Sequence, residues 1–299
     1  MCRLYGFRSA IDSAVHHSLV DAENAISRQS SKHQDGWGVA FYVDRFPHVI
    51  RNDAQALCDT LFREVSAVVS TRTLVAHIRQ ATAGSVRVLN CHPFQHGAWT
   101  FAHNGQICGF AHPEVRKRVE LCIDPRFRRF VLGDTDSERF FYVVLSHLAR
   151  QVDDIQHPGV TVAHVEVALR EAVQAIVTAA APDEVDGERP TRLNLLMTNG
   201  HVLVGYRRGV DLFFSTHKTV CPERETCWAY NARRCESDAH DGIVQHLLVS
   251  SEVISKGTNV WKPLLDDEFV AVDHGMNLVR GCLGVPVNAR VAGGQPTCS

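Results

Sequence analysis

Hydrophobic and polar positions alternate in the first part of this chain and then change to a helical spacing. Residues 35–44 (DGWGVAFYVD) alternate and are rich in β-forming side chains, which predicts a strand. Residues 48–51 predict its partner strand, after a turn at Pro47. Residues 54–69 carry apolar side chains at helical spacing, so a helix is expected after this strand pair.

Two apolar runs and two long amphipathic segments follow. Residues 73–80 (TLVAHIRQ) predict a buried strand, and residues 98–105 (AWTFAHNG) predict another strand that ends in a turn. Residues 136–152 predict a helix that begins at the acidic cap region GDTDSE. Residues 160–180 predict a second long helix, with its apolar side chains on one face.

From residue 193 onward the pattern changes to short apolar runs, which predict strands. TNGH (198–201) predicts a tight turn between two of them. Residues 181–191 predict an exposed loop, and residues 284–299 predict a flexible tail. Strands, then helices, then strands again favour a layered α+β fold over alternating βαβ units. Because no stretch resembles a linker, we expect one domain over residues 2–283.

Composition and charge place the chain among folded globular proteins. Of its 299 residues, 45% are hydrophobic and 21% are charged, a balance unlike that of disordered chains. A chain of this length can bury a substantial core without metal or disulfide crosslinks. The formal net charge is −2, which provides no basic field, so we expect neither a nucleic acid nor a membrane as partner.

The first residues and the cysteine content indicate the compartment. No apolar run approaches the roughly 20 residues of a membrane-spanning helix, and the start lacks the apolar core of a signal peptide. Ten cysteines in such a chain favour reduced thiols, most of them packed as small hydrophobic side chains. We therefore expect a cytoplasmic protein.

The second residue is a cysteine, and this position has chemical consequences. An initiator methionine before a small side chain is normally removed, which would leave Cys2 with both a thiol and a free α-amine. A thiol is only a few per cent thiolate near neutral pH and needs a base. An α-amine, with an ordinary pKa of about 7.7–8.0, can accept the thiol proton. Cys2 is therefore a candidate nucleophile that carries its own base.

Four further segments stand out in order after Cys2: HQDGWG (33–38), AHIRQATAG…NCHPF (76–94), FAHNG (101–105) and GDTDSE (133–138). Taken alone, HNG is an ordinary turn and DTDSE an ordinary helix cap. Together with Cys2, the ordered set resembles the class II (N-terminal nucleophile) glutamine amidotransferases, in particular compact stand-alone bacterial members. It is also similar to the glutaminase-type hydrolases of glutathione breakdown and of the ergothioneine pathway.

The resemblance implies three catalytic residues. Cys2 would attack the side-chain amide of glutamine and form a thioester. The side-chain amide of Asn104 and the backbone N–H of Gly105 would hold the oxyanion that forms at the attacked carbonyl. A glycine suits position 105 because no side chain then stands between its N–H and the substrate.

The resemblance also implies the residues that bind the substrate. Arg79 interrupts an apolar strand, and a buried guanidinium needs an anionic partner, here the α-carboxylate. Asp136 would accept the α-ammonium, while Thr82 and His92 would shape the carboxylate end of the pocket. Residues 35–37 belong to a loop expected beside Cys2, where packing and a direct role are both open.

The fold implied by the resemblance is a four-layer αββα sandwich, the Ntn-hydrolase fold, with two stacked antiparallel sheets and no metal or organic cofactor. The predicted helices 136–152 and 160–180 would lie in its outer layers. Gln80 and Ala83 stand where the glucosamine-phosphate-synthase branch has Trp and His, which sets this chain apart from that branch.

Three functions stay open at this point. The enzyme could hydrolyse glutamine, alone or for a separate ammonia-accepting synthase, or it could hydrolyse another γ-glutamyl amide or peptide. A non-catalytic metal-binding or interaction module is the third alternative. Its basis is the density of Cys and His between Cys91 and His112, although these residues lack the paired spacing of a zinc site. The cysteines of CPERETC (221–227) and Cys235 are expected to be surface or half-buried thiols.

Overall fold

Two antiparallel sheets form the centre of the protein. The computed structural model describes residues 2–180, 190–238, 241–254 and 258–286. The first sheet has seven strands in the order β11-β9-β10-β1-β4-β2-β3. Their bounds are β1 (Arg3–Ala14), β2 (Trp37–Val43), β3 (Phe46–Asn52), β4 (Ser70–Ile78), β9 (Phe213–Ser215), β10 (His246–Ser250) and β11 (Lys262–Pro263).

The second sheet has six strands in the order β13-β12-β8-β7-β6-β5. Their bounds are β5 (Phe94–His96), β6 (Trp99–Gln106), β7 (Arg192–Thr198), β8 (Leu203–Tyr206), β12 (Glu268–Val272) and β13 (Leu278–Cys282). A buried apolar cluster that includes Leu4 and Val75 of the first sheet and Leu196 and Val270 of the second lies between the two sheets. The sheets therefore stack face to face.

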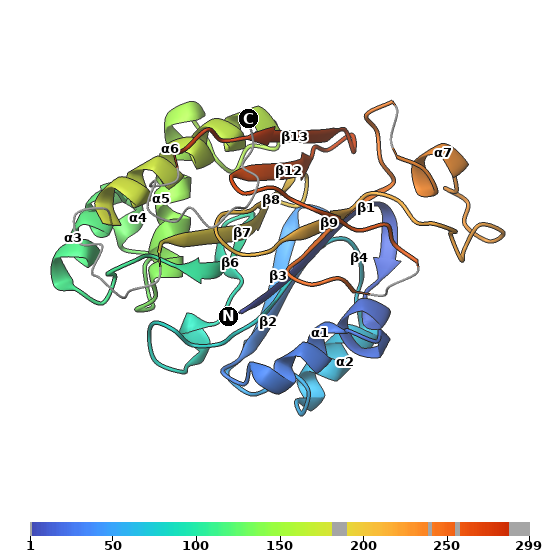
Figure 1. Ribbon diagram of the computed structural model, residues 1–299, viewed down its shortest axis with the longest axis horizontal. Coiled ribbons are helices and arrows are strands. Elements are labelled where there is room, and N and C mark those ends of the chain that lie inside the picture. Colours follow the sequence, from blue (N-terminus) through green and yellow to red (C-terminus); the bar gives the residue numbers. More distant parts are fainter. Residues whose placement is uncertain (1, 181–189, 239–240, 255–257, 287–299) are drawn as a thin grey trace.

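Helices cover the outer faces of both sheets (Figure 1). Over the second sheet lie α5 (Asp136–Gln151) and α6 (Val162–Ala180), and α3 (Pro113–Leu121) and α4 (Pro125–Arg128) pack against these two. The first sheet is covered by α1 (Ile26–Gln29), α2 (Thr60–Val68) and the short π-helix η1 (His17–Asp21). The remaining helical segments are η2 (Ser30–Lys32), η3 (Val88–Asn90) and α7 (Ala232–Cys235). This is the predicted four-layer αββα sandwich.

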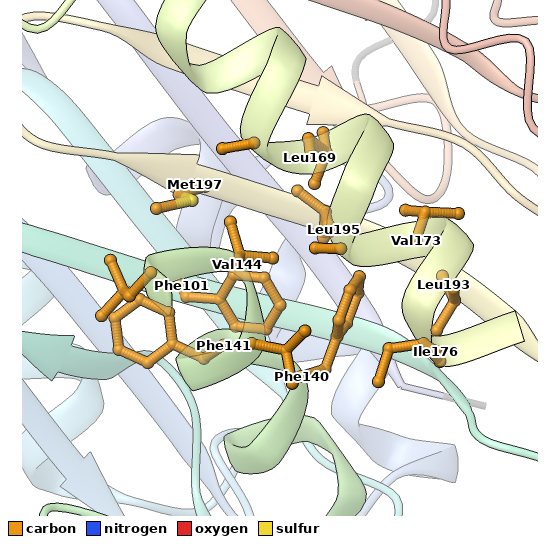
Figure 2. Close-up of a cluster of buried hydrophobic side chains, with 14 of the residues drawn as sticks. Phe101, Phe140, Phe141, Val144, Leu169, Val173, Ile176, Leu193, Leu195 and Met197 are labelled. Carbon is orange, nitrogen blue, oxygen red and sulfur yellow. The ribbon is translucent and has the colours of Figure 1, made fainter. Parts of the chain in front are cut away.

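Apolar side chains at helical spacing hold α5 and α6 on the second sheet. Figure 2 shows Phe140 and Phe141 of α5 and Leu169 and Val173 of α6 gathered over strand residues such as Leu195. All belong to one cluster of buried side chains. Thr135 caps the start of α5, because its hydroxyl accepts the backbone N–H of Glu138 at 3.2 Å. Both long helices were predicted within two residues of their observed ends.

The predicted turn at Pro47 is wrong. Pro47 lies inside β3, opposite Tyr42, and the chain reverses three residues earlier at Asp44, which has a φ of 54°. Proline fits here because β3 is the edge strand of its sheet, where a missing N–H breaks no ladder hydrogen bond.

Two further boundaries differ from the sequence pattern. The helix predicted over 54–69 begins only at Thr60, because the Asp59 carboxylate accepts the N–H of Leu61 at 2.9 Å and caps it there. The strand predicted to end in a turn at residue 105 continues instead through Gln106, since β7 pairs with β6 along this whole stretch. The turn predicted at 198–201 is present, with Gly200 at a φ of 86°.

Some predictions fall on parts of the chain that are not described. Most of the loop predicted over 181–191 and most of the tail predicted over 284–299 lie outside the described residues. Among the described residues, none of the helices has the length and apolar character that a membrane crossing requires.

Replacing Phe140 with alanine tests the layer between α5 and the second sheet. This ring is completely buried, so Phe140→Ala should lower the free energy of unfolding by about 3–5 kcal/mol. Leu132→Ala is the control, because this side chain is 65% exposed and its loss should change stability by no more than about 0.5 kcal/mol. Urea unfolding followed by far-ultraviolet circular dichroism measures both. Equal effects would contradict the described packing.

Candidate active site

Strand pairing brings Cys2 to the end of β4. Arg3 pairs with Ile78 in the β1–β4 ladder, so the residue before β1 lies beside the residues that follow β4. The backbone N–H of Gln80 donates to the Cys2 Sγ at 3.3 Å, and the thiol donates to the Gln80 carbonyl at 3.4 Å. The sulfur atom is therefore held at one place by the backbone of a single residue.

Burial keeps this thiol protonated. Loss of solvent raises the pKa of the Cys2 thiol above its ordinary value, while the Gln80 N–H and the Arg79 guanidinium pull it in the opposite direction without offsetting the burial. A thiol with a raised pKa is a weak nucleophile at neutral pH. Any chemistry at Cys2 therefore needs a base close to the sulfur.

Arg79 is a buried cation without a carboxylate partner among the described residues. Its side chain is only 2% exposed. The guanidinium donates to the backbone carbonyls of Ala83 at 3.2 Å and of Asp35 and Gly84 at 3.5 Å each. Carbonyl dipoles stabilise a guanidinium less than a carboxylate does. The position therefore suits an anionic ligand.

Asp136 is the matching buried anion. It begins α5 and is 3% exposed. One carboxylate oxygen accepts the N–H of Ile107 and the other accepts the N–H of Ser137, each at 2.8 Å. In the described part of the chain, no basic side chain lies within ion-pair distance of this carboxylate. Two opposite charges thus stay unpaired within the same site.

A small cavity contains both charges and the thiol. Its lining consists of Cys2, Arg79, Gln80, Thr82, Ala83, His92, His103, Gly105, Thr135, Asp136 and Ser137. Six of the seven predicted site residues are in this set. The exception is Asn104, which is 1% exposed and directs its amide nitrogen to the Ser251 hydroxyl at 3.4 Å.

The two residues predicted to shape the pocket differ in exposure. Thr82 is exposed, in the loop after β4. His92 is buried, with its ring centroid 4.1 Å from that of His77 and 4.6 Å from that of Phe94. Burial lowers the pKa of the His92 imidazole well below its ordinary value, so the ring is neutral. His92 therefore adds polarity without charge.

Gly105 is required by a close backbone approach rather than by a turn. A Cβ at this position would lie 1.9 Å from the carbonyl oxygen of Arg192 on the neighbouring strand β7. It would also lie 2.5 Å from the Nε2 of His103. The motif HNG therefore lies in a tightly paired strand at the cavity wall, although its composition is typical of a turn.

Residues 35–37, which lead into β2 at Trp37, support the segment after β4. The carboxylate of Asp35 accepts the N–H of Ala81 at 2.8 Å. Gly36 has a φ of 120°, and a Cβ there would lie 2.5 Å from the Sγ of Cys91. Trp37 instead donates its indole N–H to Asp59 at 2.7 Å. These contacts hold residues 35–37 around Arg79 and give them a packing role.

Five residues of the cavity lining were not among the predicted site residues: Gln80, Ala83, His103, Thr135 and Ser137. His103 lies between the Arg192 carbonyl, 3.0 Å from its Nε2, and the Ser137 hydroxyl, 2.8 Å from its Nδ1. A carbonyl only accepts, so Nε2 carries the proton. Burial lowers the pKa of the His103 imidazole, so the ring is neutral and Nδ1 accepts from Ser137. His103 lies in the motif HNG and Ser137 in the motif DTDSE, so these motifs could have indicated both residues.

The cysteine and histidine residues between Cys91 and His112 do not converge. Cys91 donates its thiol to the Asn52 carbonyl, whereas His96 packs against the rings of Phe127 and Phe130. Within the ranges that the structure describes, no group of three or more His, Cys, Asp or Glu side chains is arranged to hold a metal ion.

Most of the chain matches a known protein family. Residues 1–220 match the family model described as Glutamine amidotransferases class-II. The chain belongs to this family.

Individual relatives match over parts of their length. The uncharacterized protein MJ1515 of Methanocaldococcus jannaschii is 31% identical over 157 residues, which cover 50% of this chain and 40% of that protein. The gamma-glutamyl-hercynylcysteine sulfoxide hydrolase of Mycobacterium tuberculosis is 33% identical over 117 residues, covering 36% of this chain and 50% of that protein. The matched segments thus span half or less of these relatives.

A solved structure shows the same fold over nearly the whole chain. The glutamine aminotransferase class-II domain protein of Silicibacter pomeroyi aligns with a TM-score of 0.65 and 18% identity. The alignment covers 96% of this chain and 100% of that one. The likeness therefore includes the last third of the chain, well beyond the sequence motifs, the last of which ends at residue 138.

Replacing Gly105 tests the backbone approach at the cavity wall. Gly105→Ala should destabilise the protein by about 1–3 kcal/mol, because the strand must shift to admit the methyl group. Activity should fall as well. In the control Gly275→Ala, the nearest atom is the end of the exposed Asn277 side chain at 3.0 Å, and a change within about 0.5 kcal/mol is expected. Thermal unfolding measures both; a Gly105→Ala variant as stable as the control would refute the pairing.

Proposed function

We propose that this protein hydrolyses the γ-carboxamide of glutamine through a thioester on Cys2, releasing glutamate and ammonia. One observation carries the proposal: a held thiol, an unpaired buried guanidinium and an unpaired buried carboxylate line the same cavity. A free α-amino acid head carries one charge of each sign. Arg79 then binds the α-carboxylate and Asp136 the α-ammonium, with the side-chain amide directed at Cys2.

The base in this mechanism is the α-amine that Cys2 gains when Met1 is removed. It accepts the thiol proton as the sulfur attacks the amide carbon, which offsets the effect of burial on the thiol. The attacked oxygen becomes an oxyanion, held by the side-chain amide of Asn104 and the N–H of Gly105. The C–N bond then breaks, and the ammonium group returns the proton to the departing ammonia.

Water completes the reaction. It attacks the thioester carbon, the same base accepts a proton from it, and the C–S bond breaks to release glutamate and the free thiol. Losing one oxyanion donor typically costs about 10²–10³-fold in rate, so both donors matter. His92 and Thr82 complete the wall around the carboxylate end. The residues of the site require no metal or organic cofactor for these steps.

A second substrate class is supported by one relative. The Mycobacterium tuberculosis protein is named a gamma-glutamyl-hercynylcysteine sulfoxide hydrolase. Arg79 and Asp136 would bind the glutamyl head of such a γ-glutamyl amide as they bind glutamine. The alternative is therefore hydrolysis of a γ-glutamyl peptide or other γ-glutamyl amide, and a separate ammonia-accepting synthase would be the partner only for the glutaminase.

Comparing substrates tests the two alternatives. Purified protein is incubated with glutamine and with several γ-glutamyl peptides, and released glutamate is measured by a coupled dehydrogenase assay. Glutamine turnover with little peptide hydrolysis supports the first proposal. Turnover of peptides without turnover of glutamine would replace it with the second, and turnover of neither would refute both.

Replacing the nucleophile gives a sharper test. Cys2→Ala and Cys2→Ser should abolish turnover, while thermal unfolding stays close to that of the wild type because one small side chain is exchanged for another. An uncleaved N-terminal tag should be nearly as damaging, since it converts the basic amine to an amide. Full activity of the tagged protein, or of Cys2→Ala, would rule this mechanism out. Cys58→Ala, at an exposed thiol, is the matched control and should retain activity.

A further inference from the structure

A serine from the end of the first sheet contacts the proposed oxyanion residue. Ser251 directly follows β10 and is buried, with 7% of its surface exposed. Its hydroxyl oxygen accepts the side-chain N–H of Asn104 at 3.4 Å and the backbone N–H of Leu4 at 3.0 Å. Ser251 lies beyond the 1–220 segment that matches the family model.

This one hydroxyl connects the two sheets at the site. Leu4 lies in β1, two residues after the proposed nucleophile, and its carbonyl also accepts the N–H of Ser251 at 3.0 Å. Asn104 lies in β6 of the second sheet. The strand that follows Cys2 and the strand that presents the oxyanion donors therefore meet at the Ser251 side chain.

Hydrogen-bond capacity shows what this contact does. A hydroxyl has two lone pairs and one hydrogen, so the N–H groups of Leu4 and Asn104 use both acceptor positions. The amide nitrogen of Asn104 has two hydrogens in one plane. A hydrogen bond from one of these hydrogens to Ser251 fixes the plane of the amide group. It therefore also fixes the direction of the other N–H. At 3.4 Å the bond is long, so it contributes more to orientation than to stability.

We propose that Ser251 is a positioning residue that orients the Asn104 amide toward the oxyanion. The inference rests on the proposed thioester mechanism, in which Asn104 is an oxyanion donor. Ser251 itself does not touch the substrate. Its effect is on the transition state, where the oxyanion develops, and not on binding of the glutamyl head at Arg79 and Asp136.

Kinetics of Ser251→Ala test the proposal. The amide remains but can rotate, so kcat should fall about tenfold, less than the 10²–10³-fold expected for loss of a whole oxyanion donor. KM should stay within about twofold, since the groups that bind the head are unchanged. Ser251→Thr keeps the hydroxyl and should restore most of kcat. The substrate is whichever of glutamine or the γ-glutamyl peptides the wild type hydrolyses best.

The neighbouring serine provides a matched control. Ser250 is also buried, and its hydroxyl donates to the Leu4 carbonyl at 3.3 Å and accepts the N–H of Glu252 at 3.4 Å. Within the described residues it makes no hydrogen bond to Asn104. Ser250→Ala also removes a buried hydroxyl group and should leave kcat unchanged.

A double variant separates positioning from a general structural effect. If Ser251 acts through Asn104, adding Ser251→Ala to Asn104→Ala should lower kcat no further. Equal losses in Ser250→Ala and Ser251→Ala, a change confined to KM, or additive losses in the double variant would each overturn the inference while the wild type remains active. An inactive wild type would instead refute the proposed function.

Discussion

The pairing of β1 with β4 is the constraint on which the site depends. It places the residue before β1 against the residues after β4, so the thiol of Cys2 lies between the N–H and the carbonyl of Gln80. Arg79, one residue earlier, is brought into the same cavity by the same ladder. The proposed nucleophile lies near a chain end, where it would otherwise be free to move, and regular backbone hydrogen bonds fix it beside the proposed binding residues.

The second feature is the separation of two buried charges. Arg79 is held by backbone carbonyls and Asp136 by backbone N–H groups, so each is partly stabilised without being neutralised by the other. Burying unpaired charges costs stability, and proteins retain them where a ligand completes the pairing. The arrangement supports recognition of a zwitterionic head, which glutamine and γ-glutamyl peptides both possess.

Much of this could be predicted from the sequence because the signals were local. The helices 136–152 and 160–180 follow from apolar spacing, and the motifs around Arg79, Gly105 and Asp136 follow one another in order. The family was predicted correctly from these motifs and the fold from the family. The turn predicted at Pro47 was wrong because proline is also tolerated in a strand at a sheet edge. Local composition does not reveal which strand lies at the edge.

Contacts between distant segments could not be predicted. The sequence near Ser251 has no motif, and its relation to Asn104 exists only because β10 pairs with β1 and the two sheets stack. His103 and Ser137 stood inside recognisable motifs, yet their mutual hydrogen bond depends on how α5 packs on β6. Register and sheet stacking are properties of the whole chain, and short patterns do not encode them.

Mass spectrometry of the protein after incubation with diazo-oxo-norleucine, an alkylating analogue of glutamine, tests whether Cys2 is the N-terminal nucleophile. We expect a chain that begins at Cys2, with a single adduct on that residue and protection by excess glutamate. A chain that keeps Met1, or an adduct on a different cysteine, would contradict this expectation.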